Sequence, residues 1–158
     1  MAYGVKFALK AAESDFVVPP FETLWWADDM SSFTKGKREE WQWTAMLRIP
    51  DDLSLSEFTE ARETVVTKQE KKKEGVFPRL LRAVRVAQYA EGDCLQYLHV
   101  GPFAEEAPIL AKLHDNVMPS LGLAFVGNHH EVYLSDPRRV AQEKLKTILR
   151  QPVKPAKS

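Results

Sequence analysis

Cysteine is nearly absent from this chain, since Cys94 is the single one in 158 residues. That scarcity excludes a disulfide framework and a zinc site built from cysteines. Long hydrophobic runs are missing too, because no segment approaches the ~20 apolar residues of a membrane-spanning helix. The first residues lack the basic start and apolar stretch of a secretory signal. We therefore expect a cytoplasmic protein that does not enter membranes.

An excess of charge of one sign is also lacking, since 22 Lys and Arg residues balance 22 Asp and Glu residues. A chain without a basic excess has little drive to bind phosphate backbones, so we expect no direct contact with nucleic acid. The local exception is the basic stretch 138–158, which is typical of a solvated end. The sequence also lacks a glycine-rich phosphate loop and a serine-nucleophile elbow.

What the chain does contain is hydrophobic patterning that switches between strand and helix periods. Trp41 and Trp43 open an alternating run that predicts a strand, and Ser54 with Glu57 forms a capping box that predicts a helix. The predicted elements are a helix over 2–12, strands over 21–27 and 41–49, a helix over 54–73, strands over 84–89 and 94–100, a helix over 104–120, a hairpin of 123–126 with 129–134, and a last helix from about 138 to 151.

These elements fall into two halves of a single domain. The first half covers residues 1–52, a linking helix covers 54–74, the second half covers 76–152, and a basic tail covers 153–158. Each half contains a helix, a strand pair and a stop made of Pro and Asp, which indicates an internal repeat even though sequence self-similarity is weak.

The stretch from His129 to Pro137 places a carboxylate in the middle of an apolar, β-branched run. Because side chains alternate along a strand, His129, Glu131 and Tyr133 should share one face. Glutamate is depleted in strands and is costly to bury without a partner. Glu131 therefore either faces solvent or belongs to a site, where a desolvated carboxylate can act as a general base or as the counter-charge of a cation.

Aromatic side chains are the second candidate feature. Four tryptophans, at positions 25, 26, 41 and 43, can stack on a planar ligand or contact a cation, or can simply fill the core. Neighbours such as Trp25 and Trp26 point to opposite faces, so about half of the four should line a site. Tyr97 and His99 share one face of the 94–100 strand and are further candidates.

Two other kinds of chemistry receive weak support. His129 and Glu131 have the spacing of metal ligands on a strand, but the sequence positions no third ligand, whether His99 or His114, so we expect no metal. Cys94 falls on the face opposite Tyr97, and a lone buried thiol is usually inert.

Several ordered blocks along nearly the whole chain resemble the stand-alone GyrI-like small-molecule-binding proteins. The resemblance implies an α+β fold of duplicated β-α-β-β (SHS2-type) units, with antiparallel sheets around a central groove. BmrR-type effector domains share this fold. The matching blocks are Pro20-Phe-Glu-Thr-Leu-Trp-Trp26, Trp41-Gln-Trp43, Leu98-His-Val-Gly-Pro-Phe103, Glu106-Ala-Pro108, His129-His-Glu-Val-Tyr-Leu-Ser-Asp-Pro-Arg-Arg139 and Lys144-Leu-Lys-Thr-Ile-Leu-Arg-Gln-Pro152.

For function, the resemblance implies binding of planar aromatic small molecules, cationic ones among them, and hydrolysis of cyclopropane-bearing alkylating compounds without a cofactor. Glu131 would be the general base, with Tyr133 or Tyr97 donating to a substrate carbonyl. The expected ligand contacts are Trp26, Trp41, Trp43, His99 and Phe103.

The alternatives to hydrolysis are sequestration without chemistry and ligand sensing, and a homodimer is left open. The sequence departs from the family pattern in two places. Phe103 stands where the family usually has Tyr, and the first half is expected to lack its leading strand.

Overall fold

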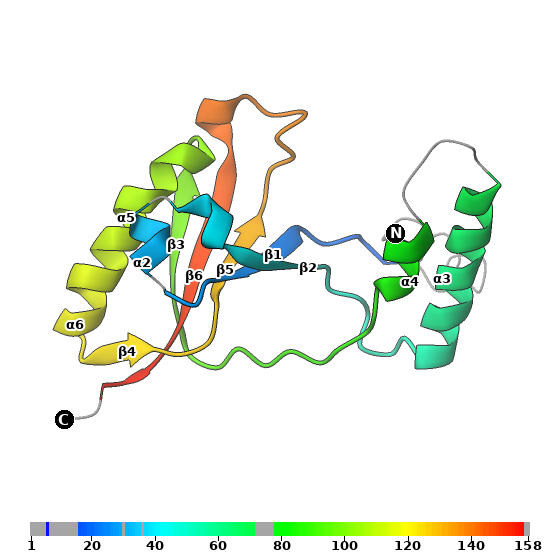
Figure 1. The fold of residues 1–158 in the computed structure, drawn as a ribbon, viewed down its shortest axis with the longest axis horizontal. Coiled ribbons are helices and arrows are strands. Elements are labelled where there is room, and N and C mark those ends of the chain that lie inside the picture. The colour runs from blue at the N-terminus through cyan, green and yellow to red at the C-terminus, as the bar shows by residue number, and fades with distance from the viewer. Residues whose placement is uncertain (1–5, 7–15, 30, 36, 72–77, 157–158) are drawn as a thin grey trace. The chain divides into compact units, whose positions relative to one another are not determined.

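The computed structural model describes residues 6, 16–29, 31–35, 37–71 and 78–156 (Figure 1). The chain divides into two compact units. One consists of Met1–Pro19 with Leu47–Tyr89, and the other of Pro20–Met46 with Ala90–Ser158. The helix predicted over 2–12 lies outside the described residues apart from Lys6, which is helical.

The helices of the first unit with described bounds are α3 (Leu55–Glu70) and α4 (Pro78–Ala83). The predicted capping box is confirmed. The Ser54 hydroxyl accepts from the Glu57 backbone N–H, and the Glu57 carboxylate accepts from the Ser54 backbone N–H. Phe58 and Ala61 form the buried side of α3, against Phe16, Leu53 and Val84. The sequence thus predicted this helix and its start because both are set by local contacts.

The second unit is a six-stranded antiparallel sheet with helices, a mixed α/β arrangement. The strand order is β2-β1-β5-β6-β3, and β4 pairs separately with β6. The strands are β1 (Phe21–Trp26), β2 (Gln42–Met46), β3 (Cys94–Val100), β4 (Leu123–Phe125), β5 (His129–Tyr133) and β6 (Lys146–Pro155). The helical elements are α2 (Ser31–Thr34), η1 (Arg38–Glu40), η2 (Phe103–Glu105), α5 (Glu106–Lys112), the π-helical η3 (Leu113–Val117), α6 (Met118–Ser120) and η4 (Gln142–Lys144).

The two faces of this sheet carry different side chains. Opposed residues of antiparallel strands share a face, and successive residues point to opposite faces. We call one the Glu131 face and the other the His130 face. The Glu131 face comprises Phe21, Thr23 and Trp25 of β1, Trp43 and Ala45 of β2, Leu95, Tyr97 and His99 of β3, His129, Glu131 and Tyr133 of β5, and Thr147, Leu149 and Gln151 of β6.

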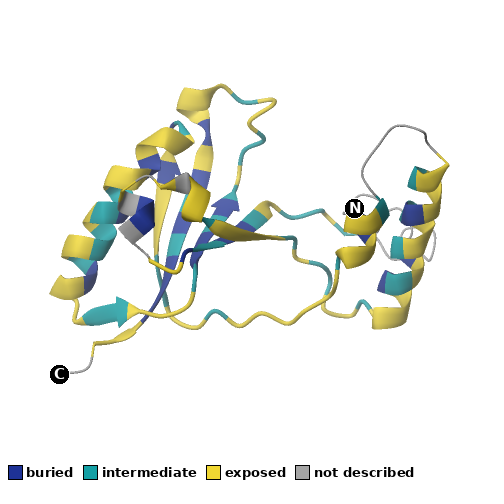
Figure 2. Ribbon diagram, in the orientation of Figure 1, coloured by how far each residue is buried: buried dark blue, intermediate teal, exposed yellow. Residues whose placement is uncertain are grey.

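Helices cover part of the Glu131 face. The ring of Phe103, in η2, meets the ring of Tyr133 edge-on at 5.7 Å, so the helical segment starts against this face. From there α5, η3 and α6 continue beside the sheet (Figure 1). The buried positions of the unit include Leu110, Met118 and Leu149. Figure 2 shows buried stretches on the central strands and on the helices.

The helix predicted over 138–151 is wrong, because these residues form η4 and the first part of β6. The run from Lys144 to Arg150 has apolar residues that fit a helical period as well as a strand period. The strand prevails because it pairs with β5 on one side and β3 on the other, which buries Leu149 and Thr147 completely. Tertiary pairing therefore overrides the local preference.

The hairpin predicted for 123–126 with 129–134 is also wrong, since β4 pairs with β6 and β5 pairs with β1 and β6. Gly127 does take a positive φ of 66°, so the turn exists while the strand pairing differs. Residues 84–89 have no strand partner within the described chain, although a strand was predicted there. Strand β3, by contrast, matches its predicted bounds of 94–100.

Within the described residues, no helix combines the length and apolar character required to cross a membrane.

Candidate functional site

Glu131 lies at the centre of a polar contact network on the Glu131 face. Its Oε2 accepts a 2.5 Å hydrogen bond from the Tyr133 hydroxyl, and its side chain is 12% exposed. The Tyr133 hydroxyl in turn accepts from Trp25 Nε1 at 3.3 Å. The two residues are two apart on β5, so alternation places them side by side. Burial, reinforced by the Glu131 charge, raises the pKa of Tyr133, which keeps its phenol protonated as a donor.

Aromatic rings surround this network. Tyr133 stacks on Phe21 at 5.8 Å and meets the edge of Phe103 at 5.7 Å. Trp25 contacts Trp41 at 5.9 Å and Trp43 at 6.4 Å between ring centroids. Several of these rings remain open to solvent, with Trp43 60% and Phe103 41% exposed. A carboxylate among partly exposed rings can attract a planar or cationic molecule by charge and by stacking.

A second carboxyl group, that of Glu106, approaches Glu131 from the first turn of α5. Glu106 is buried, and its Oε1 has no hydrogen-bond partner among the described residues. Burial and the nearby Glu131 charge raise the pKa of Glu106 to about 8. The Glu106 carboxyl is therefore protonated at neutral pH, while Glu131 accepts a donor hydrogen bond.

Buried polar atoms without partners continue along the same face. Neither ring nitrogen of His129 has a hydrogen bond within the described chain, although Nε2 lies 3.4 Å from Glu131 Oε1. Thr147 Oγ1 and Gln151 Oε1 on this face, and His114 Nε2 in η3, are likewise buried and unpartnered within the described residues. Burial, together with nearby His129, lowers the pKa of His114 to about 4, so its ring is neutral at pH 7. Unsatisfied groups in such numbers are uncommon in cores and are typical of functional sites.

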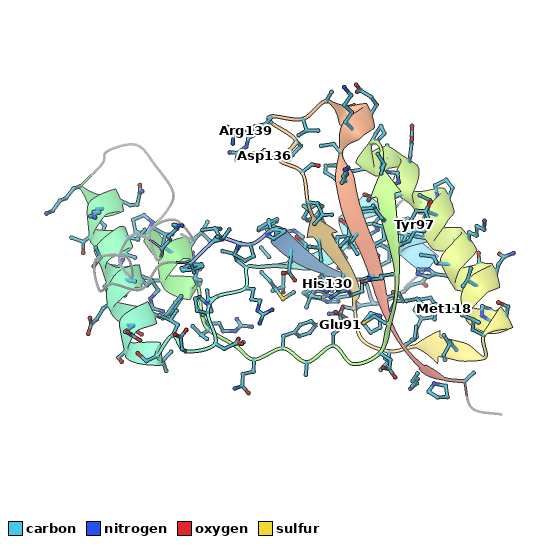
Figure 3. The ribbon with its side chains drawn as sticks, turned by 180° about the vertical axis from the view of Figure 1, so that it is seen from behind. Glu91, Tyr97, Met118, His130, Asp136 and Arg139 are labelled. Atoms are coloured by element: carbon cyan, nitrogen blue, oxygen red, sulfur yellow. The ribbon has the colours of Figure 1, made fainter. Side chains whose placement is uncertain are left out.

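The His130 face carries a polar cluster whose charged groups are paired with one another. His130 Nδ1 lies 2.8 Å from Glu91 Oε1, and His130 Nε2 lies 2.9 Å from Glu22 Oε2. Arg150 Nη1 donates to Glu91 Oε2 at 2.8 Å. Figure 3 shows Glu91 and His130 side by side. Both ring nitrogens of His130 face carboxylate oxygens, so only the doubly protonated ring can donate to both. We call His130, Glu22, Glu91 and Arg150 the His130 cluster.

The structure brings together some of the predicted site residues. Glu131, Tyr133 and Phe103 are in direct or near contact, and Trp41 and Trp43 join them through Trp25. The sequence interpretation of His129, Glu131 and Tyr133 as one face is confirmed.

Other predicted residues lie farther away. Tyr97 and His99 share the Glu131 face, but they belong to the edge strand β3, and β6 separates them from β5. His99 Nε2 contacts the Pro102 carbonyl at 3.0 Å. Trp26 alternates to the His130 face, opposite Glu131.

Trp25 and Glu106 belong to the site although the sequence did not predict either as a ligand contact. Trp25 was identifiable from parity, since it pairs with Trp43 across β1 and β2. Glu106 gave no local signal, because its burial depends on how α5 packs on the sheet.

Metal and thiol chemistry find little support here. Across the described chain, no three His, Cys, Asp or Glu side chains are grouped as metal ligands, so His99 and His114 do not complete a set with His129 and Glu131. The pKa of the Cys94 thiol is raised, chiefly by burial, which disfavours the thiolate.

A carboxylate among aromatic rings, on a sheet partly covered by helices, defines a domain that binds small molecules. Residues 6–154 match the GyrI-like small molecule binding domain. The chain belongs to the GyrI-like family, as its sequence blocks predicted.

Solved structures from Listeria innocua are similar to this chain. An uncharacterized conserved protein is 37% identical, with a TM-score of 0.78 over 97% of this chain and 74% of that one. A hydrolase is 36% identical, with a TM-score of 0.74 over 96% and 75% of the two chains. The hydrolase encoded by lin2189 is 34% identical, with a TM-score of 0.74 over 96% and 76%. None of the curated proteins matches the chain.

Proposed function

We propose that this chain binds planar aromatic small molecules on the Glu131 face and hydrolyses those that carry an electrophilic cyclopropane ring. The observation that carries this proposal is the Glu131 carboxylate, mostly buried and bonded to Tyr133 in the middle of the aromatic rings. Two similar structures from Listeria innocua are hydrolases, which favours catalysis over binding alone. The biological role would be detoxification.

In this reaction the planar part of the substrate stacks on the exposed rings of Trp43 and Phe103. Glu131 takes a proton from a water molecule and directs the oxygen of that water at a cyclopropane carbon. Tyr133 holds the Glu131 carboxylate in position. Positioning a water against a strained ring requires no metal or cofactor. The site would open onto the central groove between duplicated β-α-β-β units that the sequence resemblance implies.

The test is incubation with a spirocyclopropyl cyclohexadienone, followed by mass spectrometry. We expect protein-dependent addition of one water, and Glu131→Gln should lower kcat by roughly 10²–10⁴-fold because the general base is lost. Glu143→Gln, at an exposed position in η4, is the matched control and should leave turnover unchanged.

Sequestration is the competing function, and the same experiment separates the two. A compound recovered unchanged from a tight complex with the wild-type protein would rule out hydrolysis. In that case Glu131→Gln should weaken binding of cationic ligands more than binding of neutral ones, because the variant removes the counter-charge.

A further inference from the structure

Addition of water to a conjugated cyclopropane needs a proton donor as well as a base. Negative charge develops on the substrate carbonyl oxygen as the ring opens, and a positioned acid stabilises that charge. The Tyr133 hydroxyl does not fill this role, since its proton is given to Glu131 Oε2 at 2.5 Å. Its oxygen is also occupied as an acceptor, by Trp25 Nε1.

Tyr97 is a poor donor for geometric reasons. It lies opposite Leu149, and Leu149 lies opposite Glu131, so one strand separates Tyr97 from the carboxylate. With strands about 4.8 Å apart, that separation is about 10 Å along the sheet. A substrate held at Glu131 would have to extend across Leu149 to reach this phenol.

Glu106 lies over the reacting region. The Phe103 ring touches the Tyr133 ring, and Glu106 follows Phe103 by three residues, about one helical turn, which keeps both on the same side of the segment. The Glu131 charge acts on the Glu106 carboxyl, and the Phe103–Tyr133 contact holds this end of the helical segment against β5. Because Glu106 is buried in the first turn of α5, its side chain lies between that helix and the strand that carries the network.

The carboxyl of Glu106 is also chemically available. The residue is only 6% exposed, and Oε1 has no hydrogen-bond partner within the described chain. A buried carboxyl beside a second carboxylate holds its proton, since two neighbouring negative charges repel each other in a region of low polarity. Glu106 can therefore serve as a proton donor at neutral pH.

We propose that Glu106 is the general acid of the hydrolysis and gives its proton to the substrate carbonyl oxygen. This role rests on the proposed function. The water oxygen bonds to the cyclopropane methylene carbon, and the bond between that carbon and the ring breaks. The electron pair passes through the conjugated system to the carbonyl oxygen, which takes the proton from Glu106. Glu131 receives the proton of the water, and its transfer back to Glu106 restores both groups.

The experiment compares Glu106→Gln with wild-type protein in the spirocyclopropyl cyclohexadienone assay across pH 5–10. Gln keeps the size of the side chain but has no acidic proton, so we expect kcat to fall by roughly 10²-fold or more. In wild-type protein kcat should decrease above about pH 8, as the Glu106 carboxyl ionises, and the variant should lack this alkaline decrease. Glu105→Gln, one residue earlier and exposed, is the matched control.

The outcomes separate this role from the proposed function. If the wild-type protein hydrolyses the compound and Glu106→Gln retains its kcat and its alkaline decrease, Glu106 is not the acid and Glu131-dependent hydrolysis stands. If wild-type protein adds no water, both proposals fail. Carbon-13 NMR of protein with labelled glutamate gives a readout that does not depend on activity. One carboxyl signal should titrate near pH 8, and it should be absent from Glu106→Gln. A wild-type spectrum without such a signal would also overturn the role.

Discussion

The two faces of one strand show two ways in which a protein can hold buried charge. His130 and Glu131 are neighbours on β5, yet they point to opposite sides of the sheet. On the His130 face two carboxylates, a histidine and an arginine are paired with one another. On the Glu131 face Glu106 and His129 keep polar atoms without partners within the described residues. Satisfied groups of this kind support a fold, while unsatisfied ones are available to a ligand.

The largest expected difference between the two faces is in the stability of His130 and His129 variants. His130→Leu should lower the free energy of unfolding by about 3 kcal/mol, because the Glu22 carboxylate loses its cation and the mostly buried Glu91 carboxylate keeps only Arg150. His129→Leu should cost less than about 1.5 kcal/mol, since neither ring nitrogen loses a hydrogen bond. Urea unfolding of both variants at pH 6 measures the difference.

The pH dependence of the same variants checks the cause. Burial lowers the pKa of His130, but hydrogen bonds and charges of Glu22 and Glu91 outweigh it and raise the pKa overall. A raised histidine pKa contributes stability that is complete below the unfolded-state pKa of about 6.5 and is lost as pH rises through the folded-state value. His130→Leu should lack that loss. Equal unfolding free energies for the two variants would remove the distinction between the faces.

The second prediction is a stabilising substitution on the Glu131 face. The pKa of Glu106 is raised from 4.5 to about 8, so between these values the unfolded chain has released a proton that the folded chain still holds. Stability therefore falls as pH rises across this window. Glu106→Gln should remove the penalty and raise the free energy of unfolding at pH 7 by about 2 kcal/mol.

Glu91→Gln provides the matched comparison for that substitution. It makes the same chemical change on the His130 face, where it should destabilise the protein because His130 and Arg150 lose a charged partner. Urea unfolding at pH 4.5 and pH 7 measures both, and the gain of Glu106→Gln should vanish at the lower pH. A loss of stability in both variants at pH 7 would contradict the assignment of Glu106 as a strained, functional group.

The smallest effect is expected at the tryptophan pair. Trp25→Phe should weaken binding of a planar cationic dye several-fold, because it removes the N–H that supports Tyr133 and part of the ring surface. Trp26→Phe should change the affinity less than twofold, since Trp26 lies on the His130 face. Fluorescence titration of the dye measures both. A larger loss of affinity in Trp26→Phe than in Trp25→Phe would indicate that the ligand binds on the His130 face, which would contradict our proposal.

Local patterns predicted what neighbouring residues decide. Ser54 and Glu57 fixed the start of α3, and alternation along 129–133 placed Glu131 with Tyr133. The sequence failed where distant pairing decides, because Lys144 to Arg150 fits either period and becomes a strand through contacts with β3 and β5. Glu106 was missed as a site residue for a similar reason, since its environment forms only when α5 packs on the sheet.

Strand β6 has a consequence for the order in which the molecule is made. Its ten residues pair with β3, β4 and β5, so they connect the edge strand β3 to the rest of the sheet. On the ribosome, all the remaining strands of the sheet leave the exit tunnel before residues 146–155 do. Until those residues emerge, β5 and β3 have no strand between them, and chaperones can bind the apolar surfaces left uncovered. The sheet is therefore completed in a single late step, when its last strand pairs with both neighbours, rather than gradually.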